Sequence, residues 1–139
     1  MKMKKIGLLL VLFVSLASCS NNNSDDKADT NLDYYGKWVR VSNPATNSIG
    51  SLEPFYVFNK DKTFIKTMPF EKNVSFSGTF EIVKDDAGTR FILTYPSKND
   101  WISTCIGGTL IEAYRLNESG NLVDQAGMCD RYGIFTKAK

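Results

Sequence analysis

The stretch Val74-Ser75-Phe76-Ser77-Gly78-Thr79-Phe80-Glu81-Ile82 decides the class of fold. Apolar residues and one glycine alternate in it with Ser, Thr and Glu. This period of two is typical of a strand with one face in a core and the other in water. The run Thr89–Tyr95 repeats the pattern, and the turn residues Asp85-Asp86-Ala87-Gly88 lie between the two runs. The sequence therefore predicts a β-hairpin here.

Similar short runs occur on both sides of this hairpin. Residues 53–59 and 63–68 predict a second hairpin, and residues 110–116 and 122–124 predict a third. Three further strands are expected at residues 36–42, 101–106 and 130–137. No helical period occurs after the N-terminal segment. Eight or nine short strands at this spacing are typical of an antiparallel barrel or sandwich.

The N-terminus has the features of a secretory signal peptide. Three lysines at positions 2, 4 and 5 precede the apolar run Ile6–Leu16, which leads into small residues. Eleven residues at ~1.5 Å each cover about half of a ~30 Å hydrocarbon core, which disfavours a membrane span. We therefore expect residues 1–18 to be a signal peptide.

The end of this segment, Leu16-Ala17-Ser18-Cys19, resembles the lipobox of bacterial lipoproteins. That resemblance implies cleavage before Cys19 and attachment of lipid, including palmitate-like chains, to its side chain and new N-terminus, which anchors the protein in the membrane. Ser20 stands where an Asp would favour the inner membrane, so the resemblance implies a cell-envelope protein of the outer membrane. An ordinary signal peptide followed by a coincidental cysteine is the alternative.

Residues 20–31 contain no aromatic residue and only Ala28 as an apolar one. Such a stretch buries too little surface to offset its ordering entropy. We therefore expect residues 19–32 to be the lipidated cysteine with a flexible tether, and residues 33–139 to be the folded domain.

Composition excludes several function classes. The 139 residues include 17 Lys and Arg, 15 Asp and Glu, and no His, for a net charge of +2. Removing the three lysines of the signal segment lowers the net charge from +2 to −1, which gives no reason to expect a nucleic-acid partner. The absence of His excludes Ser-His-Asp and Cys-His nucleophiles and imidazole metal sites. We expect no catalytic residues, no metal and no cofactor, and therefore no enzyme.

Two cysteines remain if Cys19 is lipidated. Cys105 and Cys129 form an even pair outside the cytoplasm, where a disulfide is the expected state. It would join the strand expected at 101–106 to the last strand. A reactive or metal-binding thiol pair is the alternative, but no Cys-x-x-Cys and no His accompany these residues.

Three ordered motifs resemble the lipocalin-like domains of Bacteroidota lipoproteins. They are Gly36-Lys37-Trp38, Phe58-Asn59-Lys60-Asp61-Lys62-Thr63-Phe64 and Gly78-Thr79-Phe80. The resemblance implies an all-β domain, a single antiparallel up-and-down β-barrel of about eight strands. It implies that Gly36 and Trp38 have a structural role at the closed end of the barrel, with Arg131 as the cation over the indole. Residues 43–52 would be either a lid loop over the mouth or an incidental surface loop.

An eight-stranded barrel is either filled by its own side chains or holds one small molecule. The candidates that would line a packed core or an apolar cavity are Phe55, Val57, Phe76, Phe80, Phe91 and Leu93. The leading hypothesis is a lipid-anchored envelope protein that binds a small hydrophobic ligand. The alternatives are a structural envelope lipoprotein or a protein-interaction module such as an envelope-anchored inhibitor. Ser77-Gly78 resembles the Ser-Gly pair of barrel lipoproteins that inhibit lysozyme, although the Lys of that motif is missing nearby.

Some polar positions admit two interpretations. Trp101, after Asn99-Asp100, either exposes an indole that stacks on a sugar or belongs to the core. The segment 124–131 is either a rigid recognition loop or a connection. The paired carboxylates, including Asp124 with Asp130, are expected to be solvated.

Overall fold

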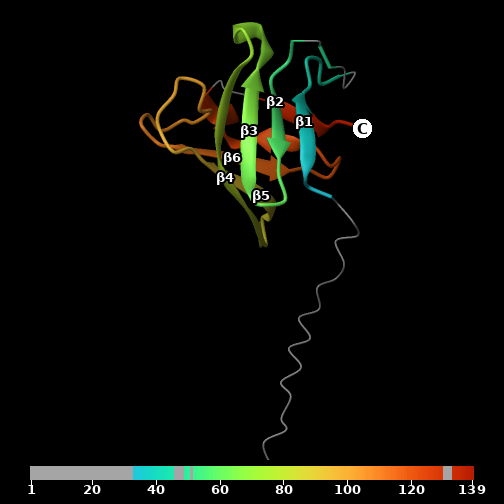
Figure 1. The fold of residues 1–139 in the computed structure, drawn as a ribbon. Coiled ribbons are helices and arrows are strands. Elements are labelled where there is room, and N and C mark those ends of the chain that lie inside the picture. Colours follow the sequence, from blue (N-terminus) through green and yellow to red (C-terminus); the bar gives the residue numbers. More distant parts are fainter. Residues whose placement is uncertain (1–32, 46–48, 51, 130–132) are drawn as a thin grey trace, which may run out of the picture. The chain divides into compact units, whose positions relative to one another are not determined.

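Each strand of the domain pairs with the next strand along the chain, and the last pairs with the first. The computed structural model describes residues 33–45, 49–50, 52–129 and 133–139. Its strands are β1 (Gly36–Arg40), β2 (Phe55–Phe58), β3 (Thr63–Met68), β4 (Val74–Asp85), β5 (Gly88–Thr94), β6 (Ile111–Leu116), β7 (Leu122–Asp124) and β8 (Ile134–Lys137). All pairs are antiparallel and the barrel is closed (Figure 1). The prediction of an all-β up-and-down barrel is confirmed.

Two short 3-10 helices, η1 (Pro69–Glu71) and η2 (Gln125–Cys129), interrupt the connections. No helix in the part of the chain that the structure describes is long and apolar enough to cross a membrane.

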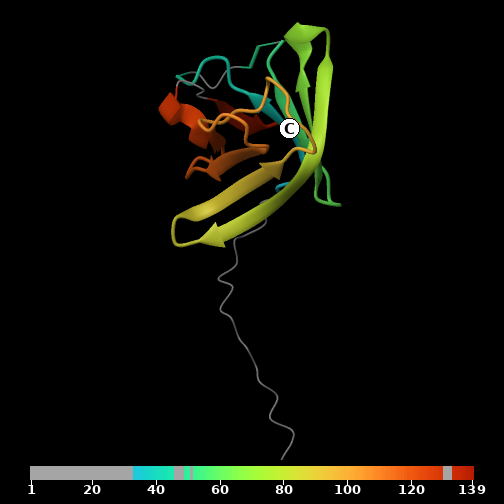
Figure 2. The same ribbon diagram turned by 90° about the vertical axis from the view of Figure 1, so that its left-hand side faces the viewer.

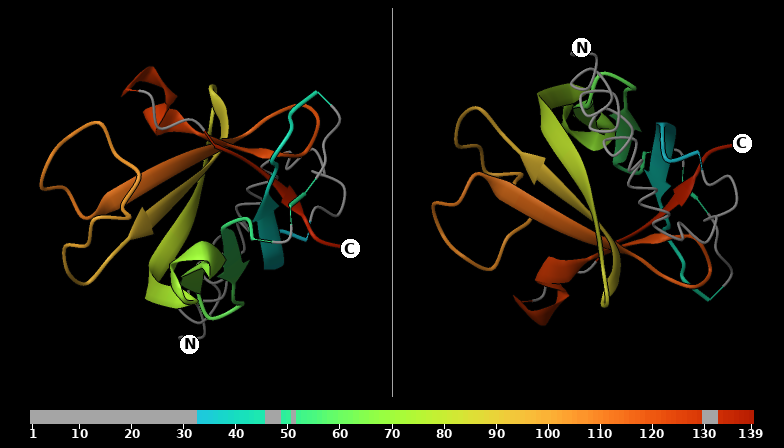
Figure 3. Two further views of the ribbon diagram at one scale, coloured as in Figure 1. Left: turned by 90° about the horizontal axis from the view of Figure 1, so that it is seen from above. Right: turned by 90° about the horizontal axis from the view of Figure 1, so that it is seen from below.

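The antiparallel order gives the barrel two unlike ends. The β2–β3, β4–β5 and β6–β7 connections are short, and they lie at the end where β1 begins, which we call the turn end. The β1–β2, β3–β4, β5–β6 and β7–β8 connections lie at the other end, which we call the loop end. Figure 3 shows the β5–β6 connection, in orange, projecting beyond the strands that it joins.

Strand β4 is long enough to pair with different neighbours along its length. Its first half pairs with β3 and its second half with β5, and Thr79 has a partner on both. The adjacent Gly78 has no room for a side chain, because a Cβ atom there would lie 2.2 Å from the Thr94 carbonyl oxygen and 2.7 Å from the Phe64 ring. The long strand curves along the barrel in Figure 2.

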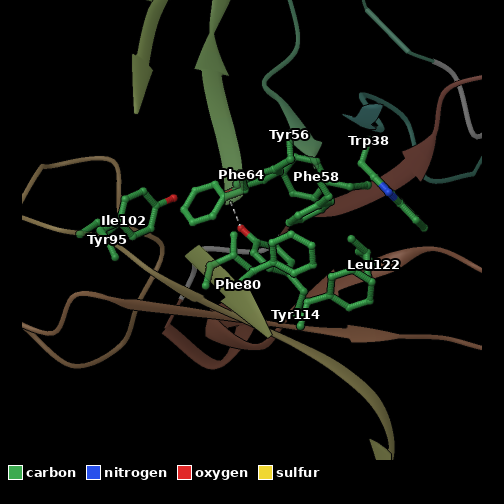
Figure 4. Close-up of a cluster of buried hydrophobic side chains, with 12 residues drawn as sticks. Trp38, Tyr56, Phe58, Phe64, Phe80, Tyr95, Ile102, Tyr114 and Leu122 are labelled. Atoms are coloured by element: carbon green, nitrogen blue, oxygen red, sulfur yellow. Dashed lines mark hydrogen bonds between the residues drawn. The ribbon is translucent and has the colours of Figure 1, made fainter. Parts of the chain in front are cut away.

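Aromatic rings fill the interior. The largest fully buried side chains are Trp38, Tyr56, Tyr95, Tyr114, Phe58, Phe64, Phe91, Leu93, Leu122 and Glu112. The rings contact one another closely: the Phe58 centroid lies 4.8 Å from that of Phe80 and 5.3 Å from that of Phe91 (Figure 4). Rings of this size in mutual contact supply most of the buried apolar surface.

The Gly36-Lys37-Trp38 motif lies near the turn end. Trp38 is 1% exposed, its ring packs on Phe91, and its Nε1 donates a hydrogen bond to the Tyr34 carbonyl oxygen at 3.1 Å. Gly36 has a φ of 102°, a value that L side chains rarely adopt. Arg131, the expected cation over this indole, lies outside the described residues.

The six candidate lining residues divide into two groups. Phe80, Phe91 and Leu93 are buried in the core, and Phe76 is partly buried against it. The prediction was wrong for Phe55 and Val57, because β2 buries its other two residues instead. All four residues of Phe55-Tyr56-Val57-Phe58 are apolar or aromatic, so alternation alone does not show which face of the strand points inward. On the outward face, the Lys37 ammonium lies 4.0 Å from the centroid of the Phe55 ring.

The prediction of a strand at residues 101–106 was also wrong. This segment belongs to the β5–β6 connection, and the Ser103 N–H donates its hydrogen bond to a side chain, the Glu112 carboxylate. The last strand is shorter than predicted and begins at Ile134; residues 130–132 lie outside the described residues.

Candidate functional site

Three charged residues occupy inward-facing positions near the loop end. Lys66 lies between the buried Phe64 and Met68 on β3, Glu112 precedes Tyr114 by two on β6, and Asp124 follows Leu122 by two on β7. Because side chains alternate along a strand, these positions share the row that elsewhere carries the aromatic core. A polar layer therefore lies over the aromatic interior.

Glu112 is the centre of this layer. Its side chain is 0% exposed, and its Oε2 accepts hydrogen bonds from the Tyr56 and Tyr95 hydroxyls, each at 2.7 Å. Its Oε1 accepts from Lys66 Nζ and from the Ser103 N–H, each at 2.6 Å. Four donors satisfy the carboxylate, which is the condition under which a buried charge is tolerated.

The tyrosines of this layer remain hydrogen-bond donors. The Tyr56 and Tyr114 hydroxyl oxygens lie 2.7 Å apart, and Tyr114 is the donor because Tyr56 gives its proton to Glu112. Burial, followed by the nearby charge of Glu112, raises the pKa of Tyr56, Tyr95 and Tyr114 above the ordinary value of 10.0. The three hydroxyls therefore stay protonated at neutral pH.

The polar layer also fixes the β5–β6 connection. Lys66 Nζ donates to the Trp101 carbonyl oxygen at 2.5 Å as well as to Glu112. The Ser103 hydroxyl donates to Asp124 Oδ2, and Asp124 Oδ1 accepts from the Ala126 N–H at 2.7 Å. These bonds hold the segment around Trp101 and Ser103 on the mouth of the barrel.

A disulfide adds a covalent connection in the same region. Cys105 and Cys129 are bonded, with Cα atoms 5.6 Å apart, so the predicted pair is confirmed. The elements that it joins differ from the prediction, because Cys105 lies in the β5–β6 connection and Cys129 ends η2. The disulfide therefore holds two loop-end connections together.

An open pocket of about 370 Å³ lies on the polar layer. It is lined by Arg40, Tyr56, Lys66, Met68, Asp100, Trp101, Ser103, Tyr114, Asp124, Gly133 and Phe135. Aromatic rings, carboxylates, cations and hydroxyls thus surround one space at the loop end, and three of its lining residues, Tyr56, Tyr114 and Phe135, also belong to the core. A neighbouring pocket of about 420 Å³ within the β5–β6 connection shares Asp100 with it.

Two residues whose surroundings the sequence alone does not decide, Trp101 and Asp124, both line this pocket. Trp101 is partly buried, packs edge-to-face on Phe70 at 5.5 Å, and contributes to the lining. Asp124 is buried, contrary to the expected solvated carboxylate, and burial raises its pKa, although its bonds to Ser103 and Ala126 oppose that shift. Asp130 lies outside the described residues.

Exposed apolar side chains surround the same end. Those between 40% and 97% exposed on loop-end connections or adjoining strand starts are Ile49, Leu52, Phe70, Val74, Ile106, Ile111 and Met128, which we call the apolar rim. Exposed apolar groups that gather in one region are typical of an interaction surface.

The sequence contains a signal for Lys66 and Glu112 that lies outside the motifs described above. Each is a charged residue at a position of a predicted strand where the alternation calls for an apolar residue, and the two charges are opposite. A charge at such a position needs a buried partner, and the other residue can supply it.

Comparisons with known proteins gave no relatives. No protein-family model matches the chain, and searches of curated proteins and of solved structures found no match. Among the described residues, no group of three His, Cys, Asp or Glu side chains is arranged to hold a metal ion.

Proposed function

We propose that this chain is a lipid-anchored protein of the cell envelope whose barrel binds a small ligand in the loop-end pocket, without catalysis. The lipobox-like Leu16-Ala17-Ser18-Cys19 supports the signal peptide, the anchor on Cys19 and the outer-membrane location. The three motifs that resemble lipocalin-like domains support a binding barrel.

The observation that carries the binding proposal is a pocket of about 370 Å³ whose floor is held by the buried Lys66–Glu112 pair. Ligand sites are concave, largely preformed, and lined by aromatic groups with a few placed polar groups. This pocket has four aromatic side chains in its lining, with charged and hydroxyl side chains in similar number. Because neighbouring rings fill the core, the ligand enters at the mouth and has a polar part that meets the polar layer.

Native mass spectrometry tests the binding proposal. The full chain is extracted in detergent from membranes of its own host, and the mass of any co-purifying small molecule is recorded. We expect a bound species that is lost in Trp101→Ala and kept in Ile65→Ala, whose side chain is 41% exposed on β3. A bound species kept in Trp101→Ala, or its absence from the wild type, would contradict the proposal.

Metabolic labelling tests the anchor separately. We expect a palmitate analogue to label the wild-type chain and not the Cys19→Ala variant. Equal labelling of the two chains, or none, would contradict the proposed anchor.

A second candidate function is protein docking, for which the apolar rim is the specific support. An inhibitor-like lipoprotein would place this rim on its target. Lysozyme inhibition by the full chain, lost in an Ile106→Glu, Met128→Glu double variant, would favour this function; the two side chains are 72% and 97% exposed, so the substitutions spare the core.

A further inference from the structure

We propose that the ligand of the loop-end pocket is a neutral saccharide that stacks on the indole of Trp101. This inference rests on the proposed binding function and names the class of ligand.

The charges of the pocket favour a neutral ligand. Lys66 is already bonded to Glu112 Oε1, and Asp124 already accepts hydrogen bonds from Ser103 and from the Ala126 N–H. An anion would lie against Asp124 and Asp100, whereas a cation would lie against Arg40 and Lys66. A neutral molecule that both donates and accepts hydrogen bonds meets both kinds of group without an unpaired charge.

The hydroxyl groups of a sugar match the donors and acceptors of the floor. Lysine supplies donors, carboxylates supply acceptors, and the hydroxyls of Tyr56, Tyr114 and Ser103 belong to the lining. A hydrocarbon chain in this place would displace water from the charged side chains of the lining, among them Arg40, Asp100 and Asp124, and would offer them no hydrogen bond in return. The floor therefore selects against an acyl chain.

The indole supplies the matching apolar surface. The Trp101 carbonyl oxygen accepts a hydrogen bond from Lys66, and the Trp101 backbone N–H donates one to Asn99 Oδ1 at 3.0 Å. The indole and the Phe70 ring pack edge-to-face. Both sides of its backbone are thus fixed before a ligand arrives, which lowers the entropy lost on binding. A pyranose ring has an apolar C–H face and a polar rim, so it can contact the indole and the floor together.

The size of the pocket limits the ligand. About 370 Å³ lies near the lower end of the ~300–1,000 Å³ range of ligand pockets. This volume suits one or two sugar rings of a longer glycan, with the open side leaving room for the rest.

The first test is a glycan array probed with labelled full chain in detergent, followed by calorimetry with the oligosaccharide that binds. We expect binding to neutral glycans that weakens at least tenfold in Trp101→Ala and less in Trp101→Phe, with Ile65→Ala unchanged. Circular dichroism confirms that each variant is folded; if Trp101→Ala does not fold, the Trp101→Phe variant and the quenching measurement below decide.

Tryptophan fluorescence gives an independent reading. The chain has two tryptophans, and Trp38 is 1% exposed, so quenching by acrylamide reports mainly on Trp101. We expect the bound oligosaccharide to reduce this quenching, and laurate, an acyl probe, to have no effect.

The outcomes separate the two proposals. Protection of Trp101 by laurate, or binding limited to acidic glycans, would overturn the saccharide inference and leave the proposed binding function standing. No binding on the array, together with no co-purifying species in native mass spectrometry, would overturn both.

Discussion

Lys66 Nζ and Glu112 Oε1 lie 2.6 Å apart inside the barrel, although 46 positions separate the two residues in the chain. The strands that carry the two residues are not neighbours in the sheet. Strand β3 pairs with β2 and β4, whereas β6 pairs with β5 and β7. The ion pair thus crosses the barrel interior, and through Lys66 it also holds the carbonyl group of Trp101.

Breaking this pair from one side should strongly destabilise the barrel. We expect Lys66→Met or Glu112→Gln each to lower the free energy of unfolding by ~3–5 kcal/mol, because each leaves a buried charge without its counter-charge. The Lys66→Met, Glu112→Gln double variant should lose less than the sum of the two. Urea unfolding followed by circular dichroism measures all three.

A surface ion pair provides the matched control. Lys137 and Asp33 lie 3.1 Å apart with side chains 33% and 67% exposed, so Lys137→Met should cost less than ~1 kcal/mol. Equal losses in Lys66→Met and Lys137→Met, or additive losses in the double variant, would show that the buried pair has no special role.

Gly78→Ala should disrupt β4. The added Cβ atom would meet the Thr94 carbonyl oxygen and the Phe64 ring, so either the strand or the core must shift, and we expect a loss of ~1–3 kcal/mol or more. Gly107→Ala is the control, since a Cβ atom there meets nothing within 4 Å. Thermal unfolding compares the two, and similar melting temperatures would contradict the close approach at Gly78.

Removal of the disulfide should act on stability and on binding. A loop of about 25 residues opens in the Cys105→Ser, Cys129→Ser variant, which the chain-entropy model values at ~3–4 kcal/mol. The disulfide links η2 to the β5–β6 connection, which contains Trp101. Ligand affinity should therefore fall as well. Calorimetry and urea unfolding check both expectations, and a variant with unchanged stability would show that the crosslink constrains nothing.

Asp124→Asn should change how stability depends on pH. Burial raises the pKa of Asp124 above the ordinary 3.8, so its contribution to stability is fully present below about pH 4 and is lost as the pH rises through the folded-state pKa. Asn keeps the shape without ionising. We therefore expect the free energy of unfolding of the wild type, relative to Asp124→Asn, to fall as the pH rises above about 4, as measured by urea unfolding at several pH values. A constant difference would mean that Asp124 does not titrate in this range.

Local patterns predicted the barrel because its hairpins join neighbouring segments. The alternation from Val74 to Ile82 and the turn at residues 85–88 describe β4 and β5 well, and Gly78 interrupts the apolar row at a point where there is no room for a side chain. The cysteine pair was predicted together with the expected signal peptide, because disulfides form and persist mainly in oxidising compartments.

The site was not predictable in the same way, because it depends on contacts between distant segments. Phe55-Tyr56-Val57-Phe58 is apolar on both faces, so only its pairing with β3 places Tyr56 beside Lys66. The alternation around Ile102 and Thr104 resembles a strand, yet the backbone at Ser103 bonds to the Glu112 carboxylate. The alternation within residues 101–106 gives no sign of this competition, because the acceptor lies outside that segment.

Closure of the barrel has a consequence for how any partner is recognised. All eight described strands have a neighbouring strand on each side, so none of them is an edge strand over its whole length, although β4 pairs with β3 only over its first half and with β5 only over its second half. Extended peptides commonly bind by adding a strand along an exposed sheet edge, and the described part of this barrel offers no complete edge strand for that mode of binding. We therefore expect recognition to depend mainly on side chains and on the connecting segments, which in most proteins vary more in sequence than the strands that they join.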